Sequence, residues 1–215
     1  VPSQKTFEQL KSFTDKKINI IPFWIDTKKF FNMENKDEIR AKYSIPKDCF
    51  VIGSFQRDTE GKDLISPKLS KGPDKLIEYL KIYNREKKNL LVLLSGYRRQ
   101  YLIKELKKNG INFQYIEKPP TKVLNELYNL LDLYIVASRV EGGPQSIMEC
   151  GLIKVPIIST DVGIAGEILN SKSIIKENIL EALPDINFAY ENTQKYIIPN
   201  GLIKFNTMFR QIYEN

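Results

Sequence analysis

Short apolar runs alternate with longer stretches of helical periodicity along most of the chain. This alternation is typical of parallel strands joined by crossover helices, and it disfavours a β-sandwich or a helical bundle. The expected strands lie at residues 18–21, 50–55, 90–95, 112–116, 133–137 and 155–159, with a weaker candidate at 173–176. We therefore predict an α/β fold built on a Rossmann-like, doubly wound parallel sheet.

Prolines and the spacing of apolar residues mark the expected helices. One helix should begin at Pro144, because the fixed φ and missing N–H of proline suit the first helical position. Near the end of the chain, a single apolar stripe at helical spacing consists of Leu202, Phe205, Phe209 and Ile212. Residues 199–215 are therefore expected to form a C-terminal amphipathic helix.

Composition excludes several classes of enzyme. The 215 residues contain no histidine, so a Ser-His-Asp or Cys-His mechanism has no imidazole within this chain. The two cysteines, Cys49 and Cys150, are too few for a disulfide framework or a thiolate metal cluster, and they favour a cytoplasmic location. No signal peptide and no apolar run of about 20 residues is evident. We expect a soluble piece of a longer protein, cut at Val1.

The most informative segment follows the strand expected at 133–137. Two glycines there let backbone N–H groups approach a ligand closely, and the N-terminus of the next helix favours an anion such as phosphate. Ionised carboxylates on either side can accept hydrogen bonds from the hydroxyls of a sugar or ribose. The candidate binding residues are Ser138, Glu141, Gly142, Gly143, Pro144, Gln145, Ser146 and Glu149.

A second candidate segment is the long irregular stretch at 56–71, which exceeds an ordinary connection between a strand and a helix. Arg57 and Lys71 bracket this stretch, and together they could place two cations on a diphosphate. Lys62 and Lys68 lie within it and remain alternatives for the second cation.

Three further strand ends offer ligand contacts at the same edge of the predicted sheet. Gly53 and Ser54 end the strand at 50–55, and Gly96 follows the strand at 90–95. The backbone of Ile116 and Glu117 could read the edge of a nucleotide base.

These motifs resemble the C-terminal, nucleotide-sugar-binding domain of the retaining GT-B glycosyltransferases of family 4, the glycosyl transferases group 1. The resemblance covers nearly the whole chain. Glu141 and Glu149 are separated by seven residues, which matches the E-x7-E motif of that family. The other matching segments, in the expected order, are 20–30, 53–57 with 71–74, and 160–163. The connection at 56–71 is longer here than is usual in the family.

The resemblance implies transfer of a sugar from a nucleoside diphosphate sugar to an acceptor, with retention of anomeric configuration. The implied acceptor is a glycan, a lipid-linked saccharide or a polysaccharide precursor. Arg57, Lys71 and Glu141 are the implied catalytic residues: the two cations neutralise the leaving diphosphate, and Glu141 contacts the transferred sugar. Glu149 would hold the ribose. The resemblance implies no metal or other cofactor, and the chain has no Asp-x-Asp pair.

The same resemblance implies one donor-binding domain over residues 1–215, in which residues 1–17 are a remnant of the interdomain linker. The N-terminal acceptor domain of such enzymes is absent from this chain and is its expected partner. The isolated domain is therefore expected to bind the donor and to transfer little.

Other functions remain open on the sequence, among them a purely regulatory module with a flavodoxin-like fold. A nucleotide-sugar epimerase with a related fold would convert the donor without an acceptor. Residues 1–110 carry 24 basic and 14 acidic side chains, which is compatible with a non-catalytic nucleic-acid-binding domain. We expect no nucleic acid as a partner, because the glycines, the helix and the carboxylates serve no purpose there. The lysine-rich helices are interpreted as a solvated surface or a peripheral contact with a membrane.

Overall fold

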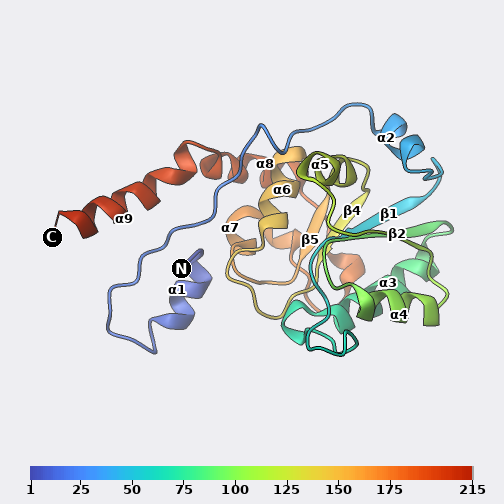
Figure 1. Ribbon diagram of the computed structural model, residues 1–215, viewed down its shortest axis with the longest axis horizontal. Helices are drawn as coiled ribbons and strands as arrows, with labels where there is room; N and C mark the ends of the chain where they lie inside the picture. The colour runs from blue at the N-terminus through green and yellow to red at the C-terminus, as the bar shows by residue number, and fades with distance from the viewer. Residues whose placement is uncertain (215) are drawn as a thin grey trace.

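The computed structural model describes residues 1–214, and within them it contains one five-stranded, all-parallel sheet (Figure 1). The strands run in the spatial order β3-β2-β1-β4-β5. The order therefore reverses between β1 and β4, which confirms the predicted doubly wound sheet. Their bounds are β1 Phe50–Ser54, β2 Leu90–Ser95, β3 Phe113–Ile116, β4 Leu133–Val136 and β5 Ile157–Ser159.

Helices cover both faces of the sheet. Figure 1 shows α3 and α4 on one face and α5 and α6 on the other. The bounds of these four are α3 Pro73–Glu86, α4 Gln100–Lys108, α5 Thr121–Asn129 and α6 Gln145–Ile153. The remaining helices are α1 Gln4–Leu10, α2 Lys36–Lys42, α7 Ala165–Ile168, α8 Ile186–Thr193 and α9 Ile203–Tyr213.

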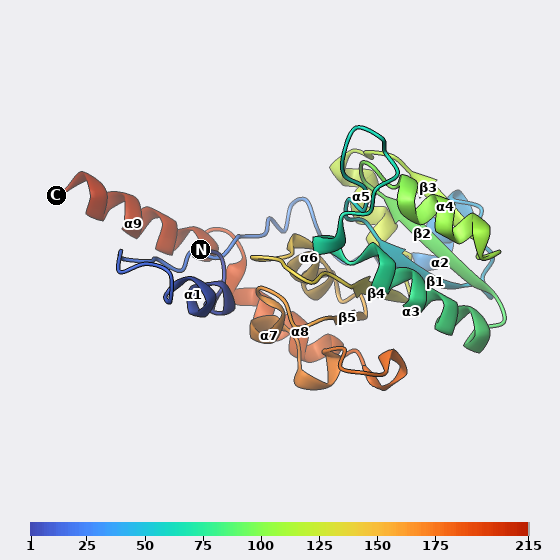
Figure 2. The same cartoon turned by 90° about the horizontal axis from the view of Figure 1, so that it is seen from below.

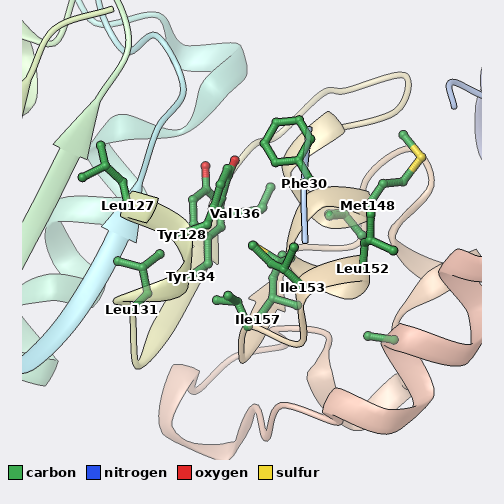
Figure 3. Close-up of a cluster of buried hydrophobic side chains, with 14 of the residues drawn as sticks. Phe30, Leu127, Tyr128, Leu131, Tyr134, Val136, Met148, Leu152, Ile153 and Ile157 are labelled. Carbon is green, nitrogen blue, oxygen red and sulfur yellow. The ribbon is translucent and has the colours of Figure 1, made fainter. Parts of the chain in front are cut away.

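The core is divided by the sheet into two layers. Successive residues of β1 point to opposite faces, so Val51 packs with α5 and α6 while Ile52 packs with α3 and α4. Figure 3 shows the α5 and α6 side, where Tyr128, Tyr134 and Ile153 are buried together. Because both faces are covered, the central strands read as continuous apolar runs in the sequence.

Two of the expected strands are not strands of this sheet. Residues 18–21 form no strand, and the hydrogen bonds there join Asn19 and Ile21 to Val1. Residues 173–176 contribute only a single bridge, from Ile174 to Ser159 at the edge of β5. An apolar β-branched run fits any extended, half-buried backbone, so the sequence pattern alone does not show whether such a run has a strand partner.

Two helix boundaries also differ from the expectation. Pro144 has an extended ψ of 115° and precedes α6, so the helix begins at Gln145 instead. The C-terminal helix begins at Ile203 rather than at 199, because a single turn of tighter 3-10 helix, Asn200–Leu202, precedes it.

The N-terminal segment and α9 extend together away from the sheet (Figure 2). The apolar stripe of α9 is only partly covered: the ring of Phe205 contacts Trp24 at 5.6 Å between centroids, while Phe209 and Ile212 are exposed. Within residues 1–214, no helix has the length and apolarity that a membrane-spanning segment needs.

Candidate functional site

A cavity of about 480 Å³ opens at the carboxyl ends of β1, β2, β3 and β4. This is the edge where a doubly wound sheet binds ligands, next to the reversal of strand order between β1 and β4. Of the residues expected to bind a ligand, those that line the cavity are Lys71, Gly96, Glu141, Gly143, Pro144, Gln145, Ser146 and Glu149. The E-x7-E segment thus contributes both of its carboxylates to one cavity.

The other expected binding residues do not line the cavity, namely Gly53, Ser54, Arg57, Ile116, Glu117, Ser138 and Gly142. Gly53 lies in β1, where a Cβ atom would come within 2.3 Å of Leu131, so this glycine serves packing. Gly142 lies under Pro2 of the N-terminal segment. Glu117 is exposed to solvent.

Two of these residues support the cavity wall from behind. The hydroxyl of Ser138 donates a hydrogen bond to Glu141 Oε1 at 3.0 Å, which orients that carboxylate. The carbonyl of Ile116 accepts a hydrogen bond from Ser95 Oγ at 3.0 Å and so joins the ends of β3 and β2. Ser138 and Ile116 therefore act through the lining residues.

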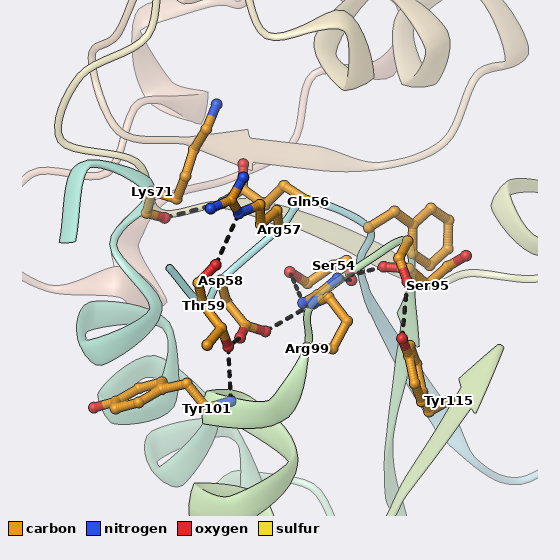
Figure 4. Close-up of polar contacts among 12 residues, drawn as sticks. Ser54, Gln56, Arg57, Asp58, Thr59, Lys71, Ser95, Arg99, Tyr101 and Tyr115 are labelled. Carbon is orange, nitrogen blue, oxygen red and sulfur yellow. Dashed lines mark hydrogen bonds and ion pairs between the residues drawn. The ribbon is translucent and has the colours of Figure 1, made fainter. Parts of the chain in front are cut away.

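Lys71 and Glu141 form an ion pair inside the cavity. The Lys71 ammonium donates to the same Glu141 oxygen that accepts from Ser138. The amide of Gln56, which the sequence did not single out as a ligand contact, donates to the carbonyl of Lys71 at 3.0 Å (Figure 4). In the free protein, the candidate phosphate cation and the candidate sugar carboxylate thus neutralise one another.

The long stretch at 56–71 folds back on itself. Two backbone hydrogen bonds close its neck, and residues 61–65 form its tip. Lys68 N donates to the carbonyl of Asp58 at 2.8 Å, and Glu60 N donates to the carbonyl of Ser66 at 2.9 Å. The tip, which includes the exposed Lys62, does not line the cavity. Of the three alternatives for the second cation, only Lys71 lines the cavity.

Arg57 lies beside this neck, next to Gln56 (Figure 4). Its Nε donates a hydrogen bond to the carbonyl of Thr59 at 2.8 Å. Among residues 1–214, the two terminal guanidinium nitrogens of Arg57 make no hydrogen bond. The side chain is half-buried, and Arg57 directly follows Gln56, which lines the cavity.

Gly72 allows the backbone after Lys71 to pass very close to the end of β4. Its φ is +61°, and a Cβ atom there would lie 1.9 Å from the carbonyl oxygen of Ala137. Only glycine combines this left-handed backbone with so close an approach. The contact brings Lys71 and Glu141 to the same wall of the cavity.

We expect Gly72→Ala to destabilise the fold by about 2 to 5 kcal/mol, because a strained φ is added to a backbone clash. Gly110 is a matched control, since its φ is +62° but a Cβ atom there would meet no other atom within 4 Å. Gly110→Ala should cost only about 1 kcal/mol. Urea unfolding of both variants measures the difference, and equal losses would contradict the assigned close approach.

Glu149 is buried in the cavity floor, with 8% of its surface exposed. Burial raises its pKa to about 7, although the Tyr128 hydroxyl donates a hydrogen bond to Glu149 Oε2 at 2.6 Å and opposes that rise. Tyr128, Phe55 and Tyr134 form the aromatic part of the floor, with ring centroids 4.7 to 5.4 Å apart. The sequence contains no sign of this role, because tyrosines in a helix and a strand read as core residues.

Lys118 and Pro119 line the cavity where Ile116 and Glu117 were expected. The chain turns at Lys118, whose φ is +44°, and this turn brings the residues after β3 to the rim. The Lys118 ammonium lies 4.0 Å from the centroid of the exposed Tyr97 ring. Lys118 therefore adds a positive charge to the cavity lining, and among residues 1–214 no carboxylate forms an ion pair with it.

Within residues 1–214, no group of three His, Cys, Asp or Glu side chains is arranged to hold a metal ion. The charged lining residues are two lysines and two glutamates, and the N-terminus of α6 completes the wall beside Gly143. This arrangement can bind a ligand that has phosphate at one end and hydroxyl groups near the carboxylates.

Solved structures with a similar fold include several sugar-transferring enzymes. Among them are a sucrose-phosphate synthase from Thermosynechococcus elongatus (TM-score 0.77, 14% identity) and a glycosyltransferase from Rickettsia africae (TM-score 0.73, 19% identity). A pneumococcal O-GlcNAc transferase, solved with UDP and GlcNAc, has a TM-score of 0.70 and 16% identity. Together with the sheet order, these similarities confirm the predicted α/β fold class, a Rossmann-like doubly wound parallel sheet that GT-B glycosyltransferases share.

The matches cover 100%, 99% and 100% of this chain but 58%, 62% and 45% of the three enzymes, in the same order. The chain thus spans less than two thirds of their length. Residues 35–196 match the sequence pattern of the family described as Glycosyl transferases group 1. The chain belongs to this family. A comparison with curated protein sequences gave no match.

Proposed function

We propose that this chain is the donor-binding half of a glycosyltransferase that moves a sugar from a nucleoside diphosphate sugar to an acceptor, with retention of anomeric configuration. The observation that carries this proposal is that Lys71, Glu141 and Glu149 line one cavity beside the N-terminus of α6. The UDP and GlcNAc bound by the pneumococcal enzyme of similar fold support a nucleotide-sugar ligand.

The diphosphate would lie between α6 and the cations. Backbone N–H groups at the start of α6, near Gln145 and Ser146, favour an anion there. Lys71 and the free terminal nitrogens of Arg57 would meet the negative charge that the leaving group gains as the glycosidic bond breaks. We propose that these side-chain cations serve in place of a metal or another cofactor.

The two carboxylates would hold the sugars at either side of the diphosphate. Glu149 would accept hydrogen bonds from the ribose hydroxyls, and Glu141 from the hydroxyls of the transferred sugar. Glu141 is paired with Lys71 in the free protein, so the donor must separate this pair when it binds. The ligand would then provide a new partner for each of the two side chains.

The proposal extends to a partner that this chain lacks. In the longer enzyme, an N-terminal acceptor domain would face the cavity and bind a glycan, a lipid-linked saccharide or a polysaccharide precursor. The proposed location is the cytoplasm, with peripheral contact to a membrane, and the two free cysteines fit a reducing compartment.

The first test is a thermal-shift panel of UDP, GDP, ADP and their sugars, because a ligand that binds only the folded state raises its melting temperature. We expect one base to give a clear shift. A panel without any shift would contradict the proposed function.

Arg57→Ala is expected to weaken binding of the selected nucleoside diphosphate about tenfold or more, and to leave binding of the matching nucleoside unchanged. A charge-assisted hydrogen bond to phosphate is lost, while the ribose contact stays. Isothermal titration calorimetry with both ligands measures the difference. Equal loss for the two ligands would rule out a phosphate role for Arg57. Lys62→Ala, at the exposed tip outside the cavity, is the control and should change neither affinity.

A further inference from the structure

Arg99 is a fully buried charge behind the cavity, with 0% of its surface exposed. Its Nε donates to Asp58 Oδ2 at 2.7 Å, and its Nη1 donates to the carbonyls of Ser54 and Ser95, the latter at 2.6 Å (Figure 4). Its Nη2 donates to Ser54 Oγ at 3.1 Å. One guanidinium therefore joins the ends of β1 and β2 to the start of the long stretch at 56–71.

This pair is not needed to fill space. Replacing a buried ion pair with apolar side chains of similar volume is often neutral or stabilising, because both charges lose their hydration on burial. What a planar guanidinium supplies is direction: its donors hold several acceptors in one fixed arrangement. Two of the acceptors of Arg99 are the carbonyls of Ser54 and Ser95. Each of these residues directly precedes a residue that lines the cavity, Phe55 and Gly96 respectively.

A chain of hydrogen bonds leads from Arg99 to Arg57 (Figure 4). The second oxygen of Asp58, Oδ1, accepts from Thr59 Oγ1 at 2.7 Å. Thr59 Oγ1 in turn accepts from the backbone N–H of Tyr101 in α4 at 3.0 Å. The carbonyl of Thr59 accepts from Arg57 Nε at 2.8 Å. The turn at 57–59 is thus held from both sides, and Arg57 is held by the one nitrogen that it does not need for a phosphate.

We infer that Arg99 is a positioning residue for the donor diphosphate. Its ion pair with Asp58 fixes the turn at 57–59, so that Arg57 keeps its two terminal nitrogens free beside the cavity before any ligand arrives. The inference rests on the proposed function, because it assigns Arg57 to the diphosphate. Holding a cation in place in the free protein spares the ligand the cost of ordering that side chain.

The test removes both charges at once, so that neither is left buried alone. The double variant Arg99→Met with Asp58→Leu is compared with the parent chain by calorimetry, using the diphosphate selected in the panel and the matching nucleoside. We expect the affinity for the diphosphate to fall about 10- to 100-fold and that for the nucleoside to stay within about threefold. A folded double variant that keeps the diphosphate affinity, or that loses both affinities equally, would overturn the inference.

A double-mutant cycle separates positioning from general damage. If Arg99 acts through Arg57, Arg57→Ala should cost affinity in the parent chain and almost nothing in the double variant. An undiminished effect of Arg57→Ala in the double variant would overturn the inference. Should the double variant not fold, Thr59→Val removes only the hydroxyl between Asp58 and Tyr101, and the same selective loss is expected at a smaller size of several-fold.

Arg40 provides the matched control at the opposite end of the sheet. It is also a buried arginine, and it donates to the carbonyl of Leu130 at 3.0 Å and to Asp132 at 2.6 Å. Arg40→Met should lower stability and leave the difference between diphosphate and nucleoside affinities unchanged. If the parent chain binds no nucleoside diphosphate, the proposed function fails. If it binds one and Arg57→Ala weakens that binding, the double variant tests the role of Arg99 alone.

Discussion

Glu149→Gln is expected to stabilise the free protein above pH 7 and to weaken its binding of nucleosides. The carboxyl of Glu149 has a pKa raised to about 7 by burial, compared with 4.5 for an ordinary glutamate. Glutamine keeps the shape and can accept the hydrogen bond of Tyr128, but it has no charge to bury. The same carboxylate is proposed to hold the ribose, so stability and binding should change in opposite directions.

The pH dependence follows from where the proton is bound. Between pH 4.5 and 7 the folded protein keeps the Glu149 proton while the unfolded chain has lost it. The free energy of unfolding therefore falls as the pH rises through this window. The loss is at most about 3 kcal/mol and is complete above pH 7. Glu149→Gln should match the parent chain near pH 4.5 and exceed it in stability at pH 8.

Unfolding in urea at pH 5 and pH 8 measures this difference, and Glu126→Gln is a control with the opposite sign. Burial alone would raise the pKa of Glu126, but hydrogen bonds from Lys42 and Tyr43 hold it below the usual value. Glu126→Gln should therefore destabilise the protein at pH 8. If Glu149→Gln is equally or less stable than the parent at pH 8, the buried, ionised carboxylate of Glu149 does not destabilise the fold.

Glu141→Gln is expected to raise the affinity for a bare nucleoside diphosphate. In the free protein the Lys71 ammonium is paired with Glu141, and a phosphate group must displace this partly buried carboxylate. Glutamine removes the competing charge and leaves Lys71 available. We expect the affinity to rise roughly fivefold, equivalent to about 1 kcal/mol. The additional affinity for the complete nucleotide sugar should be lost, because a neutral amide accepts sugar hydroxyls less strongly than a carboxylate does.

Calorimetric titrations with the diphosphate and with its sugar form give both quantities for Glu141→Gln. Glu117→Gln is the control, because this exposed glutamate lies outside the cavity and should change neither affinity. A weaker affinity of the Glu141 variant for the bare diphosphate would mean that the ion pair assists phosphate binding. The proposed exchange of partners would then be wrong.

Much of the fold was predictable because a parallel sheet covered on both faces leaves apolar runs in the sequence. The placement of Glu141 and Glu149 around one cavity was predictable too, since glycines before a helix and carboxylates on either side have a recognisable order. The burial of individual charged side chains was not predictable. Arg99 follows Arg98 in the sequence and reads as a solvent-exposed residue, yet it is fully buried because its partners come from two strands and a loop.

The dependence on tertiary contacts also explains which sequence-based expectations were wrong or left open. Residues 18–21 have the composition of a strand, but hydrogen bonds to Val1 take the place of a strand partner. Arg57 and Lys71 could be recognised as the two ends of one basic stretch, while the sequence could not choose among Lys62, Lys68 and Lys71. That choice depends on where the stretch at 56–71 folds back on itself, which is a matter of tertiary contacts.

The closed neck of this stretch makes loop length and cation spacing independent of one another. The hydrogen bond from Lys68 to Asp58 closes the neck whatever lies beyond it. We therefore expect insertions, deletions or labels at 62–65 to leave the distance between Arg57 and Lys71 unchanged. A longer loop at this position can therefore project into solvent while the spacing between Arg57 and Lys71 stays the same.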